Sequence, residues 1–408
     1  MRDLDGTYDI GICQDRIERV SRGISEKGST EIDAAGNFVS PGFVDCHTHM
    51  DKSFAGAGGR VPKYNDYELP EETRAAGISF VAQNSVKSGL EYFKKASFDE
   101  IKRHVIEHAY MQVSNGTLYT RTHVDVDGAA RTKGIEAVVE ARKELKGLID
   151  IQIVAFPQGG LLRDPESEPL IRKSIEMGAD LLGGVNPATV EGDVEKSLDL
   201  TFKIAKDYDI GIDSHIAESG ALGIYTLERL ARKAIENKYN GRIASSHSYS
   251  LAAVPETWLN RLIPLFKESG LKFITCYTST PFAMPIKRLS DAGIPVGCGS
   301  DNIRDFWIPL GNGDMVLGAL IETQRLTMTT NQDMDLIWNM ITTEGAKALN
   351  IDKDYGIKVG RKADLVVLDA PSPQWAIITQ AKKSYVIKNG KVVAMNGEVL
   401  PEFKRRFS

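Results

Sequence analysis

The sequence has only four cysteines among its 408 residues, and no two of them form a Cys-x-x-Cys pair. Cys13, Cys46, Cys276 and Cys298 are instead spread along the chain, which argues against a disulfide framework. An excess of one charge is lacking as well, because 50 basic and 55 acidic residues leave a net charge of −5. Such a mild charge does not suit a nucleic-acid partner.

Long hydrophobic runs are also missing. Met1 is followed directly by the mostly charged Arg2–Asp5 instead of an apolar signal region, and no stretch approaches the roughly 18 apolar residues of a membrane span. With 42% hydrophobic and 26% charged residues, the chain is long enough to bury a large core. We therefore expect a globular, cytoplasmic protein without a membrane or nucleic-acid partner.

Short apolar runs alternate with amphipathic stretches of helical period through the middle of the chain. Eight runs are candidate strands: Phe43–His49, Leu118–His123, Ile151–Phe156, Leu181–Val185, Ile210–His215, Ile243–His247, Phe273–Cys276 and Val296–Ser300. Eight βα units in a row predict an α/β fold of the closed (β/α)8 TIM-barrel type, because such apolar strands need both faces covered. An open doubly wound sheet is the alternative, but no Gly-x-Gly-x-x-Gly opens any of the helices.

Both ends of the chain have a different pattern. Residues Tyr8–Val39 indicate short strands and turns, and strand patterns return after about Tyr355, with Asn389-Gly390 as a hairpin turn. We therefore expect residues 1–40 and 351–408 to build one small β-sandwich domain from both termini, and residues 41–350 to form the barrel. The polar segment Tyr64–Tyr92 suits a surface insertion after the first strand.

Most of the seven histidines fall where predicted strands end. His47 and His49 are two residues apart in one strand, so they point to the same face. His215 ends the fifth strand, and Asp301 follows the eighth. Strand ends of a barrel open onto one active face, so these four side chains can converge on one divalent transition metal. Three imidazoles and one carboxylate leave room for a water, as catalytic metal sites require.

A competing signature lies between the first two strands. His104 and His108, with Glu107, match the H-x-x-E-H pattern of inverted zinc peptidases and share one helical face. This helix belongs to the outer ring of the barrel, away from the active face. A packed or solvated helix face therefore explains these two histidines better than a second metal site.

The segment Pro41–His49, the isolated His215 and His247, and the pair Ser300-Asp301 resemble the amidohydrolase superfamily. Between about Val39 and Val393, blocks similar to its cytosine deaminase branch are Arg121–Asp125, Ile153–Gln158 and Asp301–Trp307. Blocks similar to its s-triazine aminohydrolases are Tyr119–Asp127, Ser300–Met315 and Ser372–Ile378. The resemblance implies a barrel that holds one divalent metal per chain, zinc or iron, and removes an amine from a heteroaromatic ring. We also expect a homo-oligomer.

The resemblance and the chemistry together suggest roles for individual residues. Asp301 can take the proton of an activated water, and Glu218 can act as the general acid that protonates a ring nitrogen. His247, at the end of the sixth strand, suits a hydrogen bond to the tetrahedral centre. Gln158 can read a ring N–H and a carbonyl, and Trp307 can cover the ring. Lys52 and His123 lie near the same face, in a catalytic or a supporting role.

Two positions depart from the family patterns. Asn302 stands where cytosine enzymes carry a second aspartate, and its amide, which donates and accepts, is expected to bind acceptor-rich rings. Ala217 stands where triazine enzymes carry a second histidine, and the Glu218 that follows is of the cytosine deaminase type.

The sequence therefore predicts a metal-dependent aminohydrolase of the cytosine deaminase type. Its substrate is a small heterocyclic amine, from which it removes the exocyclic amine of a pyrimidine-like or triazine-like ring. One alternative is removal of an N-alkylamine from a triazine. Another is a catalytically silent barrel subunit, against which the intact set of predicted ligands argues.

Overall fold

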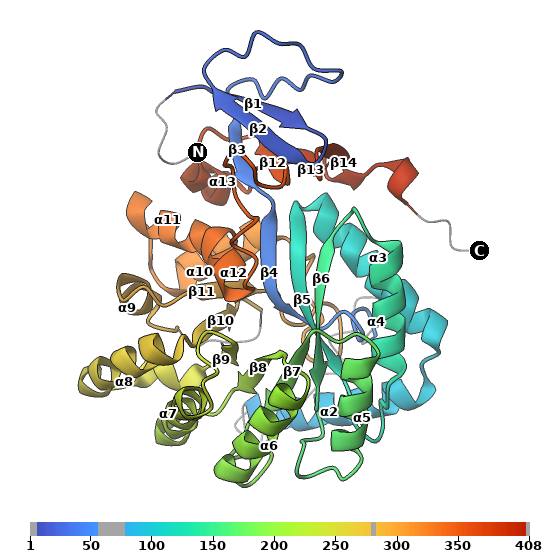
Figure 1. Cartoon of the computed structure of the whole chain (residues 1–408), viewed down its shortest axis with the longest axis vertical. Coiled ribbons are helices and arrows are strands. Elements are labelled where there is room, and N and C mark those ends of the chain that lie inside the picture. The colour runs from blue at the N-terminus through green and yellow to red at the C-terminus, as the bar shows by residue number, and fades with distance from the viewer. Residues whose placement is uncertain (1–5, 56–77, 279–282, 405–408) are drawn as a thin grey trace.

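The computed structural model (Figure 1) describes residues 6–55, 78–278 and 283–404. Its centre is an eight-stranded parallel sheet in which sequential strands are neighbours. The strands are β4 (Phe43–Thr48), β5 (Thr117–Asp125), β6 (Asp150–Phe156), β7 (Leu181–Val185), β8 (Gly211–Ile216), β9 (Ile243–His247), β10 (Lys272–Cys276) and β11 (Val296–Gly299). All eight predicted strands are present, with small shifts at their ends.

The sheet closes into a barrel where β4 meets β11. Thr48 and Asp301 form a parallel bridge, and the backbone N–H of Asp301 donates to the carbonyl of His47 at 2.7 Å. This close approach requires Gly299, because a Cβ there would lie 2.6 Å from the Cβ of His47. The closed barrel predicted from the sequence is confirmed, and its closure brings the ends of the first and eighth strands together.

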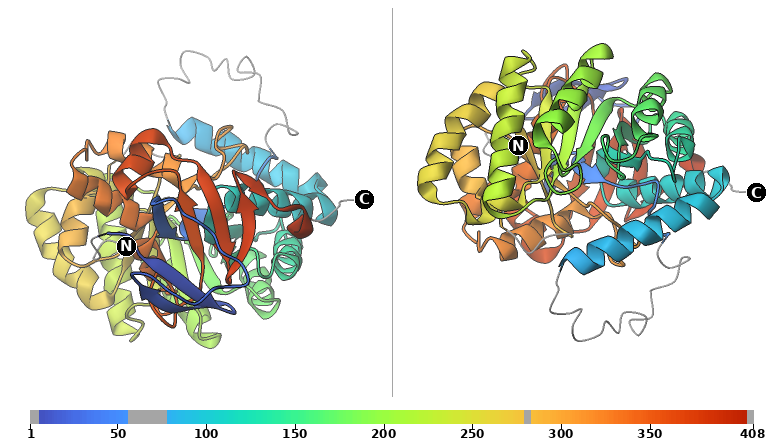
Figure 2. Two further views of the ribbon diagram at one scale, coloured as in Figure 1. Left: turned by 90° about the horizontal axis from the view of Figure 1, so that it is seen from above. Right: turned by 90° about the horizontal axis from the view of Figure 1, so that it is seen from below.

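Helices form a ring around the barrel (Figure 2). They are α3 (Phe98–Ser114), α4 (Lys133–Glu144), α5 (Ser167–Glu176), α6 (Val194–Asp207), α7 (Gly220–Glu236), α8 (Glu256–Ser269), α9 (Ile286–Asp291), α10 (Met315–Arg325), α11 (Asn331–Met340) and α12 (Thr343–Ala348). Helix α7 shows why they cover the sheet, since Leu227, Leu230, Ala231 and Ala234 form one buried stripe. None of the helices in the described ranges is long and apolar enough to cross a membrane.

The predicted insertion after the first strand is partly helical. Helix α2 (Ile78–Lys95) occupies its second half, whereas residues 56–77 lie outside the described ranges. The helix lies near the lower end of the barrel in Figure 1, the end at which β4 finishes.

Both ends of the chain meet in the small β domain at the top of Figure 1. A five-stranded sheet contains β3 (Phe38–Pro41), β12 (Leu365–Leu368), β13 (Lys383–Lys388), β14 (Lys391–Met395) and β15 (Glu398–Val399), with α13 (Pro373–Thr379) between β12 and β13. A separate two-stranded sheet contains β1 (Asp9–Cys13) and β2 (Arg16–Ser21). Asn389 and Gly390 turn β13 into β14 with positive φ, as predicted. Because β3 runs directly into β4, this domain leaves the carboxyl ends of the barrel strands open.

Candidate metal centre and active site

The carboxyl ends of β4, β8, β9 and β11 bring four imidazoles and one carboxylate together. The ring centre of His47 lies 5.2 Å from that of His49, 4.6 Å from that of His215 and 5.0 Å from that of His247. One carboxylate oxygen of Asp301 lies 3.5 Å from Nε2 of both His47 and His49. All five side chains are buried. The side chains predicted as ligands therefore surround one point, next to His247.

Hydrogen bonds at the outer ring nitrogens determine which nitrogens face this point. Nδ1 of His49 donates to a backbone carbonyl at 3.0 Å. Nδ1 of His47 lies 2.9 Å from the hydroxyl oxygen of Ser246, which itself donates to Asp213 at 2.8 Å. The Ser246 hydroxyl must therefore accept a hydrogen bond from Nδ1–H of His47, and Nε2 of both rings presents its lone pair towards Asp301.

The inward-facing nitrogens and the Asp301 oxygen lie close enough together to share one cation. Nε2 of His49 lies 3.4 Å from Nε2 of His215, and Nε2 of His47 is buried without a hydrogen-bond partner in the described ranges. Burial lowers the pKa of His49 and His215 well below the usual value and that of His247 to about 4. Although burial acts in the opposite direction, the adjacent imidazoles of His47 and His49 hold the pKa of Asp301 well below its usual range.

These protonation states fit a divalent transition metal. Neutral imidazoles and an ionised carboxylate are the forms in which these side chains bind such ions. Three nitrogens and one oxygen are a donor set of the catalytic type, which keeps a further position for water or substrate.

The backbone is strained at two of these positions. His247 has a φ of 74° and Asp301 a φ of 57°, both in the left-handed region that only glycine adopts without cost. Such conformations cost about 1–3 kcal/mol each and are concentrated at functional sites. The strain therefore supports a functional reason for the directions in which these two side chains point.

Behind His47, a chain of buried polar groups crosses the barrel interior. Arg121 donates a hydrogen bond to one oxygen of Asp213 at 2.7 Å, and the other oxygen accepts a hydrogen bond from the Ser246 hydroxyl. Sequence reasoning did not identify Asp213 or Ser246 as part of the site. A signal for Asp213 was available, because it precedes His215 by two residues and therefore faces the same side of β8.

Replacing Ser246 with alanine should weaken zinc binding about 10- to 100-fold, because His47 loses the partner that fixes its tautomer and ring orientation. Zinc affinity can be measured by competition with a chromophoric chelator. The matched control is Ser245→Ala, since the Ser245 hydroxyl contacts Ser248 at 2.8 Å and not a predicted ligand. Equal zinc affinity in Ser246→Ala and the unmodified protein would contradict this role.

Glu218, the predicted general acid, is buried directly after β8 but already has several partners. Its Oε1 accepts the backbone N–H groups of Ala188 and Thr189 at 2.7 and 2.9 Å, and its Oε2 accepts the hydroxyl of Thr226 at 2.6 Å. These bonds direct the carboxylate towards the loop after β7 and towards α7. Within the described ranges Oε2 accepts only the bond from Thr226, so it is the oxygen with a lone pair left to carry a proton.

The three predicted substrate-binding residues lie on loops that follow β6 and β11. Gln158 and Trp307 are half-buried, and Asn302 is buried. Nδ2 of Asn302 donates to the carboxylate of Asp305 at 2.5 Å, and the backbone N–H of Trp307 donates to the same carboxylate at 2.8 Å. Asn302 and Trp307 are thus held by one side chain that the sequence did not single out.

His123 and Lys52 are the two residues whose role the sequence left open, and both lie near the site. The ring of His123 packs 4.1 Å from that of His47, and burial lowers its pKa to about 3, so it is neutral at pH 7. Lys52 is bound to both oxygens of Asp125 at 2.9 and 3.1 Å. Both side chains are buried.

The two histidines of the H-x-x-E-H pattern have separate partners. Nδ1 of His104 lies 3.3 Å from the hydroxyl of Tyr92, and Nδ1 of His108 lies 2.7 Å from that of Ser53. Neither belongs to a potential metal-binding group within the described ranges. Ser53 also donates to the carbonyl of His49 at 3.0 Å. The expectation that this helix lies away from the active face is therefore wrong at His108, which contacts the loop after β4.

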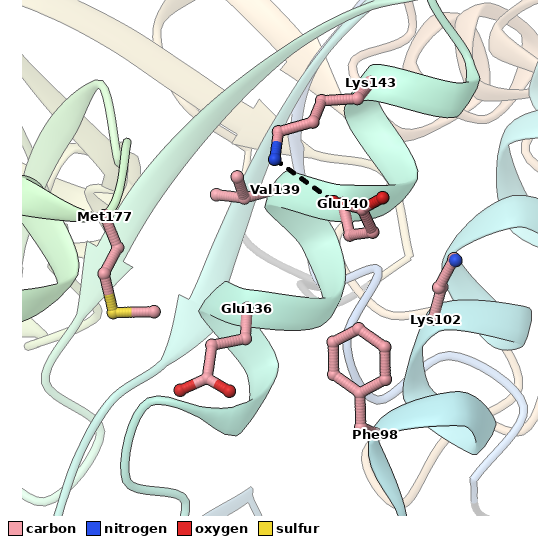
Figure 3. A pocket seen from close by; sticks show the side chains of 7 residues that line it. All are labelled: Phe98, Lys102, Glu136, Val139, Glu140, Lys143 and Met177. Atoms are coloured by element: carbon pink, nitrogen blue, oxygen red, sulfur yellow. Dashed lines mark hydrogen bonds and ion pairs between the residues drawn. The ribbon is translucent and has the colours of Figure 1, made fainter.

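An open groove of about 570 Å³ lies on the outer helical ring (Figure 3). Its lining is Phe98, Lys102, Glu136, Val139, Glu140, Lys143 and Met177, on and beside α3, α4 and α5. Glu140 and Lys143 form an exposed ion pair along α4, on one side of the groove, at 3.1 Å. None of these residues is a histidine, so the groove does not compete with the barrel mouth as the site of metal chemistry.

Several known proteins are similar to this chain in sequence or in fold. The chain is 59% identical to N-isopropylammelide isopropyl amidohydrolase of Pseudomonas sp. (strain ADP) over 96% of its own length and 95% of that protein. The crystal structure of N-isopropylammelide isopropylaminohydrolase from Burkholderia multivorans superimposes with a TM-score of 0.86, 29% identity and 97% coverage of each chain.

A second similar structure is 5-methylcytosine deaminase from Klebsiella pneumoniae with bound 5-fluorocytosine. Its TM-score is 0.84 at 26% identity, with 98% of this chain and 96% of that chain covered. The sequence pattern of the amidohydrolase family matches residues 30–394, which include every strand of the barrel and all the side chains described above. The chain therefore belongs to the amidohydrolase family and is a hydrolase that acts on C–N bonds.

Proposed function

We propose that the protein hydrolyses the bond between an exocyclic alkylamino group and an oxo-substituted triazine ring, with N-isopropylammelide as the representative substrate. The observation that carries this proposal is the 59% identity, over 96% of the chain, to an enzyme named for that reaction. It supports the alternative drawn from the sequence, loss of an alkylamine, better than the main prediction of a cytosine-type deaminase.

His47, His49, His215 and Asp301 would hold one divalent ion, zinc or iron. The convergence of these side chains supports this assignment, as do the lowered pKa values of His49, His215 and Asp301. When bound, such an ion supplies activation of water near neutral pH and polarisation of the carbon that is attacked.

The side chains of the chain itself would handle the protons. Asp301 is placed to accept the proton that the attacking water loses, since its carboxylate faces the shared point of the site. Glu218 would deliver a proton to the ring nitrogen, then take up the hydroxyl proton of the tetrahedral carbon and pass it to the departing nitrogen, so that a neutral amine leaves. The proton held by Asp301 would then restore Glu218 to its acid form. His247 would hydrogen-bond the tetrahedral carbon's oxygen, and Gln158 and Trp307 would orient the ring.

A second candidate function is deamination of a pyrimidine ring. Glu218 and the neighbouring Ala217 favour it, because they follow the cytosine deaminase pattern rather than that of the triazine enzymes. The similarity to 5-methylcytosine deaminase supports the same candidate. In both cases the leaving group is an amine on a cyclic amidine, so the residue roles are unchanged.

The cytoplasmic location and the homo-oligomer stay predictions.

Purified, metal-loaded protein incubated with N-isopropylammelide, cytosine or 5-methylcytosine separates the two functions. We expect isopropylamine and cyanuric acid from the first compound, identified by chromatography, and a lower kcat/KM for both pyrimidines. Release of ammonia from a pyrimidine without any isopropylamine from the triazine would overturn the main proposal in favour of the second candidate.

A further inference from the structure

Asp305 is fully buried in the loop after β11, four positions beyond Asp301. One of its oxygens accepts the backbone N–H groups of Trp307 and Ile308 at 2.8 and 3.1 Å. The other accepts Nδ2 of Asn302 at 2.5 Å. Both oxygens are therefore used within the loop that carries two of the predicted substrate-binding residues.

The protonation of Asp305 decides which way the Asn302 amide faces. Burial raises the pKa of Asp305 to about 6, and the positive charge of Lys52 opposes this rise. The carboxylate is therefore mostly ionised at pH 7 and can only accept hydrogen bonds. Because only the nitrogen end of an amide donates, Nδ2 of Asn302 must face Asp305. Its carbonyl oxygen Oδ1 is then the atom left to accept a hydrogen bond from a bound ring.

We propose that Asp305 is a positioning residue that sets ring specificity, by turning the Asn302 amide so that the pocket accepts a hydrogen bond from an N–H group of the substrate. This inference rests on the proposed function, since it assumes that a heterocyclic ring occupies the barrel mouth. It reverses the expectation from sequence that Asn302 would favour acceptor-rich rings. That expectation treated the amide as free to turn its NH2 group towards the ring, whereas this group faces Asp305.

The variant Asp305→Asn should invert this preference without unfolding the loop. The carbonyl oxygen of the new amide can still accept the N–H groups of Trp307 and Ile308, while its NH2 group replaces the acceptor that faced Asn302. Asn302 must then turn its own carbonyl oxygen towards position 305 and its NH2 group towards the ring. A substrate N–H would meet a donor, and a mismatched buried pair of this kind reduces affinity about 10- to 100-fold.

The double variant Asn302→Asp/Asp305→Asn supplies the matched rescue. The amide at position 305 donates to the carboxylate at position 302, whose second oxygen again presents an acceptor to the ring. The hydrogen bond of the native pair is kept with its direction reversed. A purely structural role of Asp305 predicts no such recovery of specificity.

Two pairs of probes, which differ within each pair only in ring N–H groups, test the inference by calorimetry. They are cyanuric acid with its tri-N-methyl derivative, and uracil with 1,3-dimethyluracil, so that methyl replaces hydrogen on the ring nitrogens of the second member of each pair. We expect the affinity ratio between N–H and N-methyl members to fall about 10-fold or more in Asp305→Asn and to recover in the double variant, at unchanged metal content.

An unchanged ratio in Asp305→Asn, or a ratio that the double variant fails to restore, would overturn the role of Asp305 alone. Absence of binding of all four probes to the unmodified protein would instead overturn the proposed function, and this inference with it.

Discussion

Replacing His215 with alanine should abolish both metal binding and hydrolysis while the barrel stays folded. The variant removes one of three imidazoles that face a common point, and Nε2 of His215 lies only 3.4 Å from that of His49. The ring also stacks on Phe156 at 4.1 Å, so some loss of packing energy is expected. Metal content by elemental analysis, with circular dichroism for the fold, measures both parts of this expectation.

The matched control is His104→Ala, which removes the same side chain from α3, where it is buried next to α2. Because His104 contacts Tyr92 and not the metal centre, this variant should keep full metal content and turnover. Full metal occupancy in His215→Ala would show that the ligand set is wrong. Loss of metal in His104→Ala would instead indicate that the H-x-x-E-H residues bind the metal.

Glu218→Gln should lower turnover about 10²- to 10⁴-fold while metal binding survives, which is the usual contribution of general acid–base catalysis. Glutamine keeps the size of the side chain, and its carbonyl oxygen can still accept the N–H groups of Ala188 and Thr189. It cannot carry a proton at neutral pH. Single-turnover rates with saturating substrate report the chemical step directly.

Thr226→Val is the control for Glu218, because it removes one hydrogen bond to the carboxylate but keeps the carboxylate itself. Its turnover should stay within about tenfold of the unmodified protein, since loss of one hydrogen bond is worth about 1 kcal/mol. A normal rate in Glu218→Gln would mean that the proton comes from elsewhere, and His247 would be the next residue to replace.

The barrel was predictable because its parallel strands are buried on both faces and therefore appear as uninterrupted apolar runs. The same property explains why the convergence of the candidate metal ligands was predictable. A polar residue at the end of such a run has few structural uses, so His47, His49, His215 and Asp301 stood out. The rule that active sites of barrels lie at the carboxyl ends of strands then placed them together.

The partners of these residues were not predictable from the same pattern. The hydrogen bond between Ser246 and Asp213 joins two strands, and its existence depends on barrel stagger and on side-chain rotamers. Serine within a strand has no distinctive period or spacing. Likewise, the partners of Glu218 come from the loop after β7 and from α7, so position in the sequence indicated burial near the site but not the direction of the carboxylate.

The choice between two related reactions lay beyond sequence patterns for a chemical reason. Loss of ammonia from a pyrimidine and loss of an alkylamine from a triazine need the same ligands and the same proton transfers. They differ in how a few polar atoms meet the ring, and we propose that the hydrogen bond from Asn302 to Asp305 decides which end of this amide meets the ring. The similarity over nearly the whole chain to N-isopropylammelide isopropyl amidohydrolase favours the triazine reaction.

X-ray absorption of the zinc-loaded protein tests the metal centre most directly, because it reports the atoms bound to the ion. Our account predicts only nitrogen and oxygen neighbours at about 2.0–2.2 Å, with the scattering pattern of imidazole rings. Cys276 makes the test sharp, since its sulfur lies within 4.8 Å of the ligand atoms of His47 and Asp301. A sulfur neighbour at about 2.3 Å, or oxygen neighbours without imidazole, would contradict the proposed ligand set.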